Sequence, residues 1–207
     1  MNFGSGELSD WTANPERTTP PADRAAADVW LFGDSITGQT QEDLAERLAQ
    51  QGIRLAYNSV GGRPTDATVA ALAAWLDTTP APPVVVLAAG ANNVFDPRFV
   101  ADQVDRAVGL LPTGTTILWR DAYVCRTTRP IETQVADLRN TGLVNAQLHL
   151  ASARHPGLHI IEWYAFLASR PDLLAQRLRD GVHVSEPDGV TAHNDLVLQH
   201  LEPQLRR

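Results

Sequence analysis

Residues 28–35 read Asp28-Val29-Trp30-Leu31-Phe32-Gly33-Asp34-Ser35. The apolar run has the length of a strand, and the glycine that ends it is a turn signal. Residues 41–51 then carry Leu44, Ala45 and Leu48 at helical spacing, and Gly52 follows as a stop signal. We therefore expect a strand, a tight turn and a helix in this order.

The same alternation of strand and helix continues along the chain. Further strands are expected at residues 53–57, 84–88, 116–119 and 159–161, and helices at 67–77, 99–110, 132–154, 172–178 and 188–201. Residues 84–88 are apolar throughout, which is typical of a strand buried on both faces. The pattern predicts one α/β domain, residues 28–207, with helices on both faces of a parallel sheet. Ligands of such sheets bind beyond the carboxyl ends of the strands.

Residues 1–27 are polar and contain Pro15, Pro20 and Pro21, so we expect a flexible N-terminal segment there. The N-terminus lacks a basic region followed by an apolar stretch, and the sequence therefore predicts no secretion signal. The chain as printed is expected in the cytoplasm, or in the cell envelope or outside the cell if a signal or anchor once preceded it. No apolar run approaches the roughly 20 residues that span a bilayer.

The composition excludes several kinds of chemistry. The formal net charge of the 207-residue chain is −7, so we expect no binding to nucleic acid. All 17 basic residues are arginines, which excludes a Schiff-base lysine, a P-loop lysine and a Ser–Lys dyad. Cys125 is the only cysteine, which excludes an internal disulfide. His149, His155 and His159 have no carboxylate cluster beside them, and we predict no metal and no cofactor.

Four short motifs lie where such a sheet binds ligands. Gly33-Asp34-Ser35 follows the first strand, Gly61-Gly62 the second and Gly90-Ala91-Asn92-Asn93 the third, while Asp180-Gly181-Val182-His183 precedes the last helix. Each motif alone is typical of an ordinary turn or a capped surface residue. Together they supply a serine nucleophile, oxyanion donors, a histidine base and an aspartate that orients the histidine.

In this order the four motifs resemble the SGNH hydrolase family, also called GDSL-like, over about residues 29–201. The resemblance implies a three-layer α/β/α sandwich with a flavodoxin-like, five-stranded parallel sheet. It also implies that Ser35 is the nucleophile, that His183 is the base and that Asp180 orients His183. The oxyanion hole would then combine the N–H groups of Ser35 and Gly62 with the side chain of Asn92.

The chain departs from the family pattern at two positions. The aspartate that usually follows the asparagine of the third motif is Asn93 here, which leaves the Asn92 donor in place but can alter its support. The glycine of the second motif is doubled, so Gly61 is an alternative to Gly62 as the oxyanion donor.

A softer resemblance is to bacterial cell-envelope SGNH domains, among them glycan O-acetyltransferases and acetylesterases. It rests on Gly62-Arg63, on His155-Pro156 leading to Ile161-Glu162-Trp163, and on the Asp180–His183 motif. It does not fix the substrate.

Four further side chains are candidates for substrate binding. Trp119, Tyr123 and Trp163 lie at or after the last two strands, where they could line an acyl or sugar pocket or pack in the core. Arg63 could meet an acidic substrate group, with a solvated surface arginine as the alternative.

The sequence thus predicts a serine esterase that hydrolyses a short-chain or acetyl ester. Two alternatives stay open at this point: an O-acyltransferase that uses the same residues on a glycan or another alcohol, and a catalytically silent binding domain. The acyl group, the alcohol part and the oligomeric state are not determined by the sequence.

Overall fold

Six strands form one sheet in the computed structural model, which describes residues 10–205. The order along the sheet is β1 (Glu16–Thr18), β3 (Leu55–Val60), β2 (Val29–Gly33), β4 (Val84–Ala88), β5 (Thr116–Arg120) and β6 (Leu158–Ile161). Strands β2 to β6 run parallel, which confirms the expected flavodoxin-like arrangement. The chain reverses its direction across the sheet at β2, with β3 on one side and β4 on the other, and ligands of α/β sheets bind at such a reversal.

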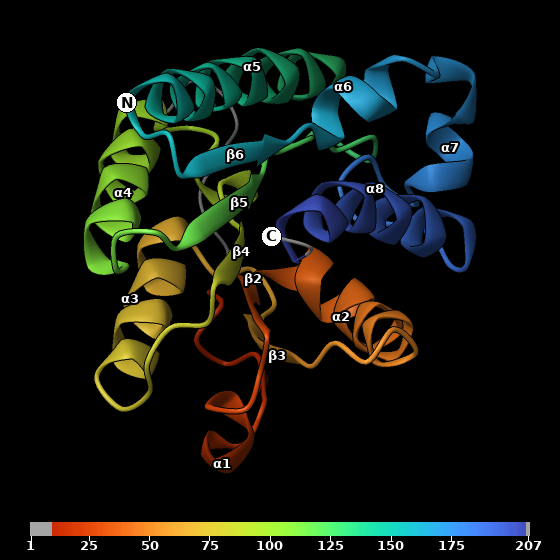
Figure 1. The fold of residues 1–207 in the computed structure, drawn as a ribbon. Coiled ribbons are helices and arrows are strands. Elements are labelled where there is room, and N and C mark those ends of the chain that lie inside the picture. The colour runs from red at the N-terminus through yellow and green to blue at the C-terminus, as the bar shows by residue number, and fades with distance from the viewer. Residues whose placement is uncertain (1–9, 206–207) are drawn as a thin grey trace.

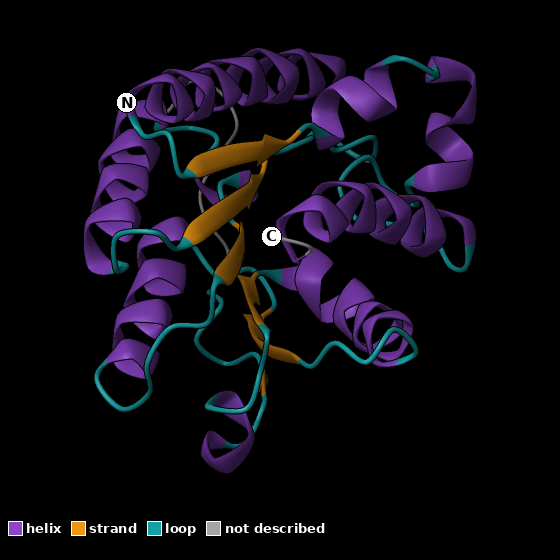
Figure 2. Ribbon diagram, in the orientation of Figure 1, coloured by secondary structure: helices purple, strands orange, loops and turns teal. Residues whose placement is uncertain are grey.

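Helices cover both faces of the sheet (Figures 1 and 2). On one face lie α2 (Ser35–Ala49) and α8 (Asp188–Leu205); on the other lie α3 (Thr65–Leu76), α4 (Pro97–Leu110) and α5 (Ile131–Arg154). The shorter elements are α1 (Pro21–Arg24), α6 (Trp163–Ala168), α7 (Leu174–Arg177) and the 3₁₀ turns η1 (Ala91–Asn93) and η2 (Pro171–Leu173). The expected three-layer α/β/α sandwich is confirmed. Over the described residues, none of the helices combines the length and apolar character needed to cross a bilayer.

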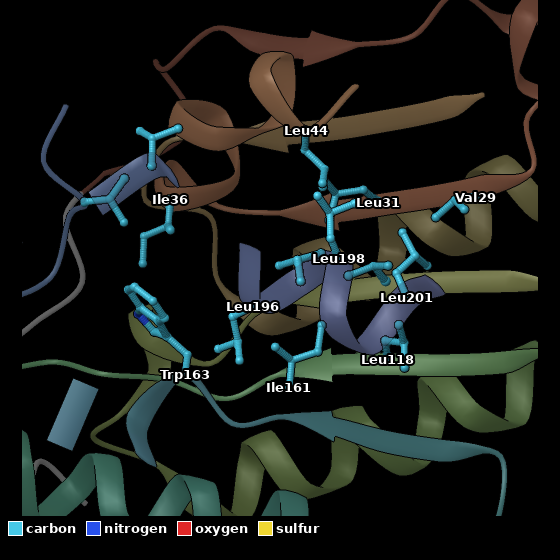
Figure 3. Close-up of a cluster of buried hydrophobic side chains, with 14 of the residues drawn as sticks. Val29, Leu31, Ile36, Leu44, Leu118, Ile161, Trp163, Leu196, Leu198 and Leu201 are labelled. Atoms are coloured by element: carbon cyan, nitrogen blue, oxygen red, sulfur yellow. The ribbon is translucent and has the colours of Figure 1, made fainter. Parts of the chain in front are cut away.

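Successive strand residues point into two different cores. Val29 and Leu31 of β2 pack on the α2 and α8 side, whereas Trp30 and Phe32 pack on the α3, α4 and α5 side. Figure 3 shows Leu31 near Leu44 and Leu198 in the first of these cores. Because both faces are buried, each central strand is apolar throughout, and polar side chains gather at the ends of the strands.

Strand β1 is the main difference from the sequence-based expectation. It pairs antiparallel with β3, with Glu16 opposite Val60 and Thr18 opposite Asn58, so the sheet has six strands and not five. Residues 16–18 of the predicted flexible segment are therefore part of the sheet, and residues 1–9 lie outside the described residues. The added strand pairs the edge of β3, and its exposed polar side chains give no apolar strand signal.

Two helical regions also differ from the expectation. Helix α2 begins at Ser35 and not at residue 41, because Asp34 Oδ1 accepts a hydrogen bond from the Ile36 N–H at 3.0 Å and caps the helix. In place of one helix over residues 172–178, the chain forms η2 followed by the short α7.

Candidate active site

Ser35 is the first residue of α2, directly after the turn that follows β2. Its backbone N–H is one of the free N–H groups at a helix N-terminus, where negative charge is stabilised. Gly33 is required in this turn, because a Cβ atom there would lie 1.8 Å from Thr37 Oγ1 and 3.0 Å from Ala88 O. The tight turn therefore brings a half-buried serine to the carboxyl edge of the sheet.

Asp180 and His183 lie in the loop before α8, and the loop backbone fixes their relative position. Asp180 Oδ1 accepts hydrogen bonds from the N–H groups of Val182 at 3.0 Å and His183 at 2.8 Å. Gly181 has a φ of +82°, and a Cβ atom there would lie 1.8 Å from Cys125 O. The motif needs glycine at this position, since only glycine fits both the backbone conformation and the close approach.

Ser35, His183 and Asp180 meet in one hydrogen-bonded chain. His183 Nε2 lies 3.0 Å from Ser35 Oγ, and His183 Nδ1 lies 2.8 Å from Asp180 Oδ2. Burial acts to raise the pKa of the Asp180 carboxyl, but hydrogen bonds from His183 and Val182 outweigh it and hold that pKa below its ordinary value. An ionised aspartate keeps the imidazole hydrogen on Nδ1 and leaves Nε2 able to accept the serine proton.

The expected oxyanion donors face the same space. Gly61, Gly62 and Asn92 line a pocket together with Ser35 and His183, and Gly62 has a φ of +73°. Asn92 Nδ2 lies 3.2 Å from Asp34 Oδ2 and 3.1 Å from the backbone oxygen of residue 63. Both contacts lie at the long end of the usual N–H···O range of about 2.7–3.2 Å. The amide is thus held at the pocket by two hydrogen bonds, one of which a negatively charged acceptor can replace.

Asn93, the departure from the family pattern, supports this loop from the inside. Its side chain is buried, and its Oδ1 accepts from the backbone N–H of Thr65 at 2.7 Å and from Thr65 Oγ1 at 2.9 Å. Thr65 begins α3, and the residue before it, Pro64, offers no side-chain cap. Asn93 therefore caps α3 from a distant part of the chain and fixes the loop that carries Asn92.

Buried charges surround the serine turn. Asp34, Arg63, Arg120 and Asp121 are each at most 3% exposed. Burial raises the pKa of Asp34 above its ordinary value, and Arg120 is the strongest influence in the opposite direction. Burial also raises the pKa of Asp121 to about 7, although its Oδ1 accepts the Tyr164 N–H at 2.8 Å. Arg120 and Arg63 offset part of the cost of burying Asp34. The Asp34 carboxylate caps α2 through one oxygen and accepts a hydrogen bond from Asn92 through the other.

Arg63 is not placed to contact a substrate, which corrects the sequence-based expectation. It is 3% exposed, and its Nη2 donates to the backbone oxygens of Gly33 at 2.7 Å and Asn58 at 2.8 Å. These bonds tie the end of β2 to the end of β3. Burial lowers the pKa of the guanidinium to about 10, so it stays charged at neutral pH.

The three aromatic candidates also lie in the interior. Trp119 and Trp163 are 0% exposed and Tyr123 is 7% exposed. Trp119 Nε1 donates to Ala89 O at 2.9 Å, and the Trp163 ring stacks on Phe166. None of the three lines the pocket at Ser35, so the expectation of substrate contact is corrected to core packing, the stated alternative.

The pocket at Ser35 and His183 has a volume of about 440 Å³. Besides the motif residues, it is lined by Gly38, Gln39 and Ser59 and by three residues of the N-terminal segment, Asn14, Pro15 and Arg17. Sequence reasoning missed the three residues of the N-terminal segment, because polar positions in a proline-rich stretch carry no periodic signal. Among residues 10–205, no group of three or more His, Cys, Asp or Glu side chains is arranged to hold a metal ion.

No protein-family model matches the sequence, and no curated protein matches it. Solved structures do match it by fold. The C-terminal catalytic domain of peptidoglycan O-acetyltransferase A from Streptococcus pneumoniae is 20% identical, with a TM-score of 0.67 and coverage of 86% of this chain and 94% of that chain. A member of the lipolytic G-D-S-L family from Veillonella parvula is 18% identical, with a TM-score of 0.69 and coverage of 83% and 96%.

A lipase/acylhydrolase from Enterococcus faecalis is also similar, with 18% identity, a TM-score of 0.64 and coverage of 86% of this chain and 96% of that chain. Fold and site together define an α/β/α protein that carries a Ser–His–Asp arrangement at the carboxyl edge of a parallel sheet. More specifically, the fold is that of the SGNH hydrolases, which confirms at the level of fold the resemblance expected from the four motifs.

Proposed function

We propose that this protein is a serine hydrolase that cleaves short-chain acyl esters of polar alcohols. One observation carries the proposal: His183 Nε2 lies 3.0 Å from Ser35 Oγ while its Nδ1 lies 2.8 Å from Asp180 Oδ2. Nucleophile, base and orienting carboxylate are thus within hydrogen-bond reach of one another without any rearrangement. The similarity in fold to lipases and acylhydrolases supports the same reaction class.

In the proposed mechanism Ser35 Oγ attacks the acyl carbonyl carbon while His183 Nε2 takes the hydroxyl proton. The tetrahedral intermediate collapses when His183 gives this proton to the oxygen of the leaving alcohol, and the acyl group stays on Ser35. Water then loses a proton to His183 and attacks the acyl-serine, which releases the acid and restores the hydroxyl. Asp180, ionised throughout, stabilises the imidazolium that forms in each half of the reaction.

The carbonyl oxygen gains negative charge in both tetrahedral intermediates. The N–H of Ser35, at the N-terminus of α2, and the N–H of Gly62 or of its neighbour Gly61 are the proposed backbone donors. Asn92 joins them by turning one amide hydrogen from its 3.1 Å contact with the backbone oxygen of residue 63 to the substrate. Its 3.2 Å contact with Asp34 can persist and keep the amide oriented.

The lining of the pocket supports a small and polar substrate. Among the described residues that line the pocket, three are glycines, and Pro15 is the only other residue without a polar side chain. A long acyl chain would therefore find few apolar side chains to pack against. Acetyl or another short acyl group on a polar alcohol fits this lining better.

An O-acyltransferase is the second candidate, because the same acyl-serine can be attacked by a second alcohol in place of water. The fold similarity to a peptidoglycan O-acetyltransferase catalytic domain favours this alternative. The two reactions differ in the fate of the acyl group. Adding sorbitol to an assay with p-nitrophenyl acetate separates them: a transferase forms acetyl-sorbitol, whereas a hydrolase forms acetate.

The proposal is tested with p-nitrophenyl esters of two, four and eight carbons, with the Ser35→Ala variant as the matched control. We expect turnover that decreases with chain length and that vanishes in the variant. Labelling of Ser35 by a serine-directed organophosphate, read by mass spectrometry, is the second measurement. Equal turnover by both proteins, or neither turnover nor labelling in the folded wild type, would contradict the proposed function.

A further inference from the structure

The N-terminal segment forms one wall of the pocket that contains Ser35. Asn14, Pro15 and Arg17 line this pocket beside Ser35 and His183. These three residues belong to none of the four catalytic motifs, and two of them, Asn14 and Arg17, have polar side chains. The segment therefore adds to the pocket a set of side chains that the reaction itself does not require.

Several hydrogen bonds attach the segment to the loops of the site. The backbone of Arg17 is paired opposite Ser59 on β3. Asn14 Nδ2 donates to Gly61 O at 2.8 Å, in the loop that carries the candidate oxyanion donors. Asn58 Nδ2 donates to Glu16 Oε1 at 2.6 Å. The wall is thus fixed to β3 and to the second motif.

Arg17 is the one arginine among the described residues that line this pocket. Its Nη1 donates to Gly38 O at 3.0 Å, and Gly38 lies one helical turn, about 5 Å, along α2 from Ser35. The same Nη1 lies 3.5 Å from Glu42, and both side chains are more than half exposed, so this ion pair is weak. A guanidinium has five N–H donors, and a ligand can therefore bind without displacing the Gly38 bond.

We propose that Arg17 forms an anion subsite, and that the preferred substrate is an ester that carries a carboxylate or a similar anionic group close to the scissile bond. The proposal rests on the proposed function and names the substrate class for the same site. An arginine on the wall of a small pocket lined mainly by polar residues provides local attraction for an anion in a chain whose net charge is −7. The anionic group can belong to the alcohol part or to the acyl part of the ester.

Matched pairs of esters test the proposal. The first pair, 3-acetoxybenzoate and its methyl ester, differs by a charge on the alcohol part. The second pair, mono-p-nitrophenyl fumarate and its methyl ester, differs by a charge on the acyl part, and the trans double bond keeps the carboxylate from attacking its own ester. For each pair the ratio of kcat/KM, charged over neutral, is measured in wild type and in Arg17→Gln. We expect the ratio of at least one pair to fall about ten-fold, the effect of one charge-assisted hydrogen bond. The pair that responds identifies which part of the substrate carries the anion.

Three variants control this comparison. Arg17→Lys should keep more of the ratio than Arg17→Gln, which separates loss of charge from loss of the segment's attachment. Glu42→Gln should raise the ratio, because the competing carboxylate is removed. Arg54→Gln, a change of an exposed arginine paired with Asp28, should leave it unchanged. Ratios in Arg17→Gln equal to those of wild type for both pairs overturn the proposal.

A binding measurement distinguishes failure of the anion subsite from failure of the proposed function. Uncleaved 3-acetoxybenzoate and mono-p-nitrophenyl fumarate are titrated into Ser35→Ala and into Ser35→Ala combined with Arg17→Gln. Binding that weakens about ten-fold in the double variant supports the anion subsite even if the wild type hydrolyses no ester. Equal affinity of the two proteins for both probes, or no binding to either protein, contradicts the subsite whatever the catalytic activity.

Discussion

Replacing Asn93 with alanine removes the two hydrogen bonds that hold the loop of the third motif against α3. Both partners belong to Thr65, which is 0% exposed, so water cannot take over the lost acceptor. A buried donor left without an acceptor costs about 1–3 kcal/mol, and the hydroxyl costs less because it can rotate. We therefore expect Asn93→Ala to lower the free energy of unfolding by about 2–4 kcal/mol.

The same change should reduce activity, because Asn92 is the next residue and its amide has to be aligned with the oxyanion. The free energy is measured by urea denaturation, and kcat/KM with p-nitrophenyl acetate. Asn93→Asp is the matched control: it keeps an acceptor oxygen for both Thr65 donors at the N-terminus of α3 and should stay within about 1 kcal/mol of wild type. A loss below about 0.5 kcal/mol in Asn93→Ala, or equal damage by both substitutions, would refute the capping role.

Four further predictions follow from the site. Asn92→Ala should lower kcat by roughly 10²–10³-fold with the fold retained, and native turnover would exclude Asn92 from the oxyanion hole. Asp180→Asn keeps a side-chain oxygen that accepts from the backbone N–H groups but no longer fixes the His183 tautomer, so kcat should fall on the order of 10²–10⁴-fold with little change in stability; unchanged kcat contradicts this. Gly181→Ala should destabilise by about 2 kcal/mol or more, since φ is +82° and the new Cβ would meet a backbone oxygen; a neutral effect in urea denaturation contradicts the geometry. The raised pKa of Asp121, about 7, means that the folded protein binds this proton above the unfolded pKa of about 4. The stability of Asp121→Asn relative to wild type should therefore rise between pH 4 and 7 by up to about 1.4 kcal/mol per pH unit and then level off, and a flat difference contradicts the shift.

Much of the fold was predictable because strand and helix leave local marks in the sequence. Residues 84–88 form a strand with the predicted bounds, and residues 132–154 all lie in helix α5, as their spacing predicts. The central strands of a buried parallel sheet are apolar on both faces, so they appear in the sequence as apolar runs of strand length between turn signals. The order of these elements was sufficient to predict the three-layer architecture.

The catalytic motifs could be recognised for a related reason, since each depends on a local backbone conformation. Asp180 and His183 are joined within one loop, and glycines stand where a Cβ atom would collide, at Gly33 and Gly181. The contact of His183 with Ser35 spans 148 positions, and the sequence alone could only infer it from the parallel-sheet rule and the family resemblance.

The sequence by itself therefore determined the five parallel strands, the helical layers and the candidates for the hydrogen-bonded triad. Only the tertiary structure decided where polar and amphipathic side chains point. It buried Arg63 and Trp119, brought Asn93 to the start of α3, and placed Arg17 on the wall of the pocket. The physical reason is that an edge strand of polar residues and an inward-turned arginine have no periodic pattern, since their positions depend on partners far along the chain.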